Sequence, residues 1–118
     1  MKRLVTIALV LALTVPLAAQ QYSYLAFEQI TVAGTAIGFT AATINIGAGH
    51  MQAETAICRL ETAQIRFAYD GTTPTTTVGT LWEVGEERQF NGHQILRNFR
   101  AIRTGGSSGQ LDCTYSTP

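Results

Sequence analysis

Few side chains of this 118-residue chain are of the types that carry out catalysis. The histidines are His50 and His93, and each stands beside glycine or turn residues, as surface histidines often do. A hydrolytic triad requires a nucleophile, a base and an orienting acid. The sequence shows no phosphate loop or dinucleotide fingerprint. We therefore expect a non-enzymatic protein, with no catalytic residue and no cofactor.

The sequence also offers few residues that could bind a metal ion or stack against a sugar. Glu83, Glu86 and Glu87 are close in the sequence, but they lack the Asp-rich spacing of a calcium loop, so we interpret them as a solvated acidic face and expect no metal site. Trp82 is the single tryptophan. Its ring has two interpretations, a stacking platform for a sugar or packing within an apolar strand, and packing is the usual role of such a residue.

The cysteines are Cys58 and Cys113. In an exported protein an even number of cysteines indicates a disulfide, although two separate buried thiols remain the alternative. A bridge would close a loop of about 55 residues. By lowering the entropy of the unfolded chain, it would stabilise the fold by about 4 kcal/mol. For so small a chain this would be a large share of the net stability.

The N-terminus has the layout of a secretory signal peptide. Lys2 and Arg3 precede an apolar run of about 12 residues, Pro16 interrupts it, and small residues follow at Ala18 and Ala19. The run is shorter than the roughly 20 residues that span a bilayer as a helix. We predict a signal peptide at 1–20 and a single domain at 21–118, secreted or periplasmic, with no membrane span after cleavage.

The charge of the remaining chain argues against nucleic acid as a partner. The whole chain has 8 Lys+Arg and 8 Asp+Glu, so loss of Lys2 and Arg3 leaves six cations against eight anions. Proteins that bind nucleic acid through its phosphates carry a strong positive excess. We expect no nucleic-acid binding.

The elements that position these residues are predicted to be strands. Short runs of β-forming residues alternate with turn residues every 8–12 positions, which is typical of a sandwich or barrel. We predict an all-β fold, a small antiparallel β-sandwich of the jelly-roll or immunoglobulin-like kind, with about seven to nine short strands. The expected strands are 22–27, 29–32, 36–40, 53–60, 65–69, 78–82, 88–90, 98–103 and 110–116.

Alternation within these strands predicts which side chains face the core. The inward residues are expected to be Ala56, Cys58 and Leu60 in the strand 53–60, Ile65, Phe67 and Tyr69 in the strand 65–69, and Leu111, Cys113 and Tyr115 in the strand 110–116. Both cysteines therefore fall at inward positions, which makes a bridge between or within the sheets reasonable. Turns are expected at Asp70-Gly71 and Asn91-Gly92.

Three arginines at a spacing of three, Arg97, Arg100 and Arg103, would form a basic stripe on a helix. On a strand, neighbouring arginines of this series would lie on opposite faces. The glycine-rich stretch that follows is a poor helix continuation and a good connector. We favour a hairpin in which 99–103 pairs back with 111–115, with the amphipathic helix kept as the alternative.

The order of several motifs resembles a known group of proteins. These motifs are Glu61-Thr62-Ala63-Gln64-Ile65-Arg66-Phe67, Asp70-Gly71-Thr72-Thr73-Pro74-Thr75 and Asn98-Phe99-Arg100-Ala101-Ile102-Arg103. They resemble small β-sandwich proteins of tailed-phage, prophage and environmental sequences, presumed to be virion-associated. The resemblance covers about 30–115 and implies a non-enzymatic structural role. An export signal and a cysteine pair depart from that group, which points to a virion-type sandwich reused in an exported protein.

Two classes of function follow. The first is a structural or assembly subunit that contacts a protein partner or forms a homo-oligomer, because the uncharged segment 21–27 is a suitable edge for pairing with another chain. Pairing within its own sheet is the simpler alternative. The second is a binding module that presents loops 70–77 and 104–109 to a glycan or a protein. Its candidate residues are Asp70, Gly71, Thr72, Trp82, Gly105, Gly106 and Ser107.

Overall fold

The computed structural model describes residues 23–45 and 52–117 of the chain. The expected signal peptide, His50 and the start of the segment 21–27 lie outside these residues. Seven strands and two short helices follow one another in the described part: β1 Ser23–Val32, α1 Ala41–Ile44, β2 Thr55–Glu61, β3 Ile65–Ala68, β4 Thr80–Trp82, β5 Glu87–Asn91, α2 His93–Asn98, β6 Arg100–Arg103 and β7 Gly109–Thr117.

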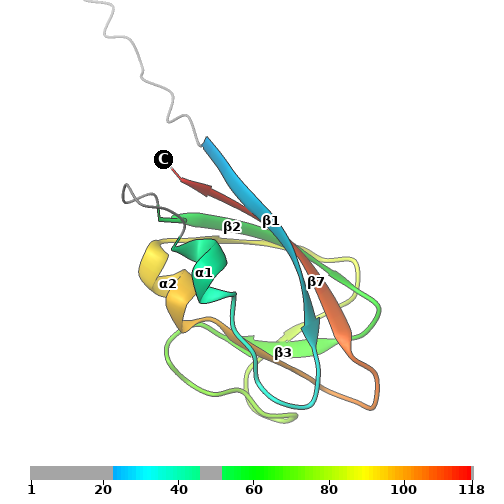
Figure 1. Ribbon diagram of the computed structural model, residues 1–118. Helices are drawn as coiled ribbons and strands as arrows, with labels where there is room; N and C mark the ends of the chain where they lie inside the picture. The colour runs from blue at the N-terminus through cyan, green and yellow to red at the C-terminus, as the bar shows by residue number, and fades with distance from the viewer. Residues whose placement is uncertain (1–22, 46–51, 118) are drawn as a thin grey trace, which may run out of the picture.

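The strands form two antiparallel sheets, which confirms the predicted small all-β sandwich. The larger sheet has the order β1-β7-β2-β5 and the smaller one the order β4-β3-β6. Figure 1 shows β1, β7 and β2 together in one layer, β3 in the other, and the two helices side by side near one end. The chain therefore crosses between the layers four times in the described part, at 61–65, 82–87, 91–100 and 103–109.

Alternation places the core as expected. Leu60, Leu111 and Tyr115 are fully buried, while Ile57 on the opposite parity of β2 is exposed. The centre of the core is aromatic: the rings of Phe39 and Phe99 stack with their centroids 4.2 Å apart. Such contacts add to the free energy gained by burying apolar area alone.

The predicted hairpin of 99–103 with 111–115 is wrong. β6 pairs with β3 in the smaller sheet, whereas β7 pairs with β1 and β2 in the larger one. The glycine-rich connector thus carries the chain from one layer to the other. The arginine stripe is absent as well, because Arg97 lies on α2 while Arg100 and Arg103 lie on β6. The helical alternative holds for 93–98 alone.

Several element boundaries also differ from the expected ones. The segments 22–27 and 29–32 belong to one strand, β1. Residues 36–40 form no strand, only a bridge between Ile37 and Ala101 followed by α1. Asn91-Gly92 does not close a hairpin: Gly92, with φ 109°, directly precedes α2. The segment between β1 and α1 lies against β6 and so covers that side of the sandwich.

Candidate binding groove

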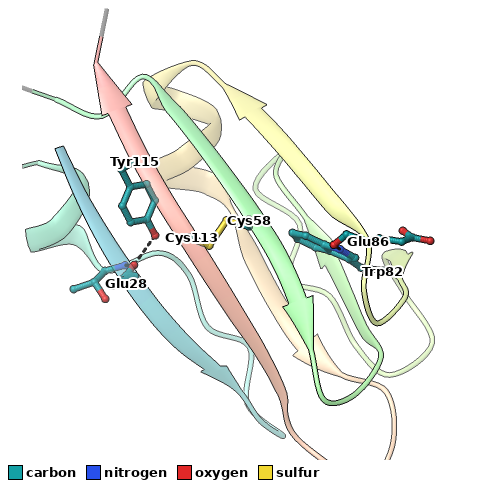
Figure 2. Close-up of a disulfide and its surroundings, with 7 residues drawn as sticks. Glu28, Cys58, Trp82, Glu86, Cys113 and Tyr115 are labelled. Atoms are coloured by element: carbon teal, nitrogen blue, oxygen red, sulfur yellow. Dashed lines mark hydrogen bonds between the residues drawn. A yellow bond between two sulfur atoms is a disulfide. The ribbon is translucent and has the colours of Figure 1, made fainter. Parts of the chain in front are cut away.

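Cys58 and Cys113 form the predicted disulfide, which links adjacent strands of the larger sheet (Figure 2). The two residues stand directly opposite each other in the register of β2 and β7. Their Cα atoms are 4.1 Å apart, and both side chains are fully buried. The bridge therefore lies within one sheet and is enclosed by the core. No free cysteine is found among the described residues, so no thiol nucleophile is available there.

Trp82 is fully buried, so its ring is not available to a ligand, and packing is the role that the structure supports. Its indole Nε1 donates a 3.0 Å hydrogen bond to the carbonyl of Glu86. The guanidinium of Arg88 lies over the same ring, with Cζ 5.6 Å from the ring centroid, and 5.1 Å from that of Phe67. Figure 2 shows Trp82 and Glu86 together at one end of the larger sheet. These contacts close the sandwich between β4 and β5 at that end.

Farther along the same side the two sheets leave an open groove. Its wider part, about 470 Å³, lies between β5 and the smaller sheet. A neighbouring part of about 360 Å³ continues toward the start of the loop 69–79. Phe67, Tyr69 and Thr80 line both parts, so Tyr69 stands at their junction. The remaining lining residues of the wider part are Arg88, Gln89, Phe90, Asn91 and Ile95.

Tyr69 is the exposed aromatic side chain of the groove, with 47% of its surface accessible. Its ring stacks on Phe67 at a centroid distance of 6.2 Å and meets Phe90 edge-on at 6.0 Å. Strand alternation predicted Tyr69 to face inward with Phe67. It does share that face, but β3 ends at Ala68, so the ring lies at the mouth of the sandwich and stays half exposed.

The loop 69–79 is held by its own polar side chains and by Arg66. Asp70 Oδ1 accepts a hydrogen bond from the Thr72 amide, and Gly71 has φ 94°. Arg66 Nε and Nη1 donate to the carbonyls of Thr76 and Gly79, at 3.1 and 2.8 Å. These hydrogen bonds fix the loop beside the groove through contacts within the protein itself.

The candidate residues of the two predicted binding loops are not brought together. Asp70 and Thr72 line the groove at the end of β3, and Gly71 lies between them. The loop 104–109 lies beside residues 62–64, which directly precede β3. The Thr104 hydroxyl donates to the Gln64 carbonyl, and the Thr62 hydroxyl donates to the Ser108 carbonyl. Gly105, Gly106 and Ser107 are therefore at the opposite end of β3 and outside the groove.

Two groups of opposite charge flank the groove. The hydrogen bond from the Thr72 amide lowers the pKa of the Asp70 carboxyl, so this group is ionised at neutral pH. Across the groove, Arg88 Nη2 donates to the Leu81 carbonyl and to a Glu86 oxygen, whereas its Nε is buried without a partner among the described residues. The groove thus has no excess of either charge.

His93 is the histidine that the structure describes, and it is the first residue of α2 rather than part of a loop. Its Nδ1 lies 2.9 Å from the carbonyl of Ala53. Because a carbonyl only accepts, Nδ1 carries the proton. The backbone amide of His93 donates a 3.2 Å hydrogen bond to the carboxylate of Glu54. No group of three or more His, Cys, Asp or Glu side chains within 23–45 and 52–117 is placed to hold a metal ion.

The sequence did not reveal an uncharged region on the outer face of the larger sheet. One row across the four strands consists of Phe27, Thr114, Ile57 and Gln89, and the next of Tyr24, Ser116, Thr55 and Asn91. Tyr24 and Phe27 share this face because the register shifts between Tyr24 and Ala26, at an irregularity typical of a β-bulge. We call these eight residues the uncharged face; Thr55 among them is buried, and the other seven are exposed or partly exposed.

In the part of the chain that the structure describes, no helix is long and apolar enough to cross a membrane. Comparison with models of known protein families, with curated proteins and with solved structures finds no match.

Proposed function

We propose that the protein is an exported, non-enzymatic structural or assembly protein, built on a phage-virion-like β-sandwich and acting through protein–protein contacts. The observation that carries this proposal is the uncharged face. Its side chains Tyr24, Phe27 and Ile57 are 65%, 54% and 38% exposed. The centre of a protein interface is depleted in charge and enriched in aromatic residues, which is the composition found here.

The distribution of charge over the same sheet supports this assignment. The row next to Phe27 consists of Gln29, Asp112, Arg59 and Glu87, three of which are charged. Charges are thus confined to one half of the outer face, as in an interface with an apolar centre and a polar rim. A sheet face that exposes aromatic and aliphatic side chains in this way is stabilised when a partner covers it.

Two further observations bear on export and on the partner. The buried disulfide between Cys58 and Cys113 suits an oxidising compartment, which supports the expected secretion. β1 is an edge strand, so its outer side offers backbone groups to another chain. The uncharged face continues onto β1 through Tyr24 and Phe27. We therefore favour a second copy of the chain as the partner.

The test is the molar mass of the exported protein, measured by size-exclusion chromatography with light scattering. We expect a defined oligomer for the wild type and a monomer for Phe27→Lys and for Ile57→Lys, because a buried unpaired charge is strongly unfavourable. Val84→Lys is the matched control, since Val84 is 50% exposed in the turn between β4 and β5. A wild type that stays monomeric at every concentration would refute the proposal.

A further inference from the structure

We propose that the groove beside Tyr69 binds a neutral saccharide, with a sugar ring lying against the exposed part of the Tyr69 ring. This site shares Gln89 and Asn91 with the uncharged face but excludes Phe27 and Ile57, whose substitution tests the proposed assembly. Its volume of about 470 Å³ falls in the range of about 300–1,000 Å³ that small-molecule sites occupy. The groove also combines an apolar floor with a few polar groups, which is the usual composition of such sites.

The aromatic part of the site comes from three rings with different exposure. Phe67 and Phe90 are buried and form the floor, while Tyr69 is half exposed above them. Contacts with both rings fix the orientation of Tyr69. One face of a sugar ring carries C–H bonds, and these pack favourably on an aromatic ring. A fixed and exposed tyrosine provides such a surface without ordering a flexible side chain on binding.

The polar part of the site comes from side chains that both donate and accept. Gln89 and Asn91 lie on β5 and Thr80 lies on β4, and all three line the groove. Amide and hydroxyl groups match the hydroxyl groups of a sugar, which also donate and accept. The amide of Gln89 already donates to Asn91 Oδ1 at 2.9 Å, so the pair is held in place before a ligand arrives.

Charge favours a neutral ligand over an acidic one. The ionised Asp70 carboxylate stands at one end of the groove, and Glu86 already pairs with Arg88 Nη2 at 3.2 Å. An acidic sugar would meet the Asp70 charge without gaining an unpaired cation.

An extended peptide added to the edge of β5 fits less well. Arg88 crosses from β5 to the Leu81 carbonyl of β4 at 3.3 Å and thereby bridges the two strand edges. The Trp82 indole makes a second link, from β4 to the carbonyl of Glu86 directly before β5. Both contacts would have to break before a new strand could run along the full length of β5. The groove therefore suits a compact ring better than an added strand.

The test is a titration of the isotope-labelled protein with cellohexaose, laminarihexaose, xylohexaose and chitohexaose, followed by amide NMR shifts. We expect at least one hexaose to shift the resonances of Tyr69, Thr80 and Gln89. Tyr69→Ala should weaken its binding by at least about tenfold, as loss of a central aromatic contact does, while Tyr69→Phe should retain binding. Val78→Ala is the matched control, because Val78 is exposed in the same loop but does not line the groove.

Three outcomes would overturn the proposal. These are the absence of groove shifts with all four hexaoses, unchanged affinity of Tyr69→Ala, and groove shifts with polygalacturonate alone. Thr80→Ala provides a second test should Tyr69→Ala fail to fold, since Thr80 is exposed, lines both parts of the groove and lies outside the uncharged face. Its affinity should also fall. Loss of binding in these variants with an unchanged oligomer separates this site from the proposed assembly.

Discussion

The hydroxyl of Tyr115 donates a 2.5 Å hydrogen bond to the carboxylate of Glu28, which joins β7 to β1 on the inner side of the larger sheet (Figure 2). Tyr115 stands opposite Ala26 in the register, so Glu28 is its diagonal neighbour. The same carboxylate accepts hydrogen bonds from the Thr40 amide, at 3.0 Å, and from the Thr43 hydroxyl, at 3.4 Å. Glu28 thus connects the sheet with the start of α1, where Thr40 makes no side-chain cap of its own.

This contact predicts a specific dependence of stability on pH. Burial, and then the hydrogen bond to Glu28, raise the pKa of Tyr115 above its ordinary value. In the unfolded chain the phenol ionises near pH 10, whereas the folded protein keeps the proton. The stabilisation is therefore complete below about pH 10 and is lost as the pH rises further. In Tyr115→Phe, stability at neutral pH should fall by about 1.5–3 kcal/mol, and the difference from wild type should shrink above pH 10.

Urea unfolding at neutral and alkaline pH measures both effects. Tyr24→Phe is the control for loss of a tyrosine hydroxyl, because Tyr24 is exposed. A difference between wild type and Tyr115→Phe that stays constant across the alkaline range would contradict the assignment.

The inward residues of β2 and β7 could be predicted from sequence, because alternation is a local property of each strand. Both cysteines and Tyr115 were placed correctly for this reason. The pairing of strands is not local. Nothing within 99–103 indicates that β3 is its partner, and the hairpin rule for neighbouring segments gave the wrong one.

The candidate site was predictable only in part. Asp70 and Thr72 were predicted as binding residues from the turn signature of their loop, and they line the groove. Tyr69 was interpreted as a core residue, because alternation does not show where a strand ends. Glu28 was missed as well: it occupies an inward position of β1, and its role depends on α1, which the sequence pattern did not indicate. Irregularities such as the register shift at Leu25 reverse the parity of a strand and hide a shared face.

Gly109 should tolerate no side chain. A Cβ at this position would lie 2.6 Å from Ile65 Cγ2 and 2.8 Å from the carbonyl of Ala63. We expect Gly109→Ala to lower the free energy of unfolding by about 1–3 kcal/mol, as overpacking does. Gly106→Ala is the matched control, because its Cβ would meet nothing within 4 Å. Equal stabilities of the two variants in urea unfolding would show that the crossing at Gly109 is not tightly packed.

Removal of the disulfide should be costly. Cys58 and Cys113 are 55 residues apart, so the bridge reduces the entropy of the unfolded chain by an amount worth about 4 kcal/mol. We expect Cys58→Ala/Cys113→Ala to lose stability of this order, measured by urea unfolding against the oxidised wild type. The double variant is used because a single one leaves a reactive thiol. A loss below about 1 kcal/mol would mean that the unfolded chain is already restricted without the bridge.

Arg66 should hold the loop 69–79 and with it the shape of the groove. Its guanidinium bonds to the carbonyls of Thr76 and Gly79, and within the loop the Val78 amide donates to Thr75 Oγ1 at 3.0 Å. We expect Arg66→Ala to cost about 1–2 kcal/mol of stability and to speed hydrogen exchange at the Val78 amide. Arg59→Ala is the control: Arg59 forms an exposed 3.0 Å ion pair with Glu61, and such pairs contribute about 0–1 kcal/mol. If Arg66→Ala leaves exchange at Val78 as slow as in Arg59→Ala, the loop keeps its conformation without Arg66.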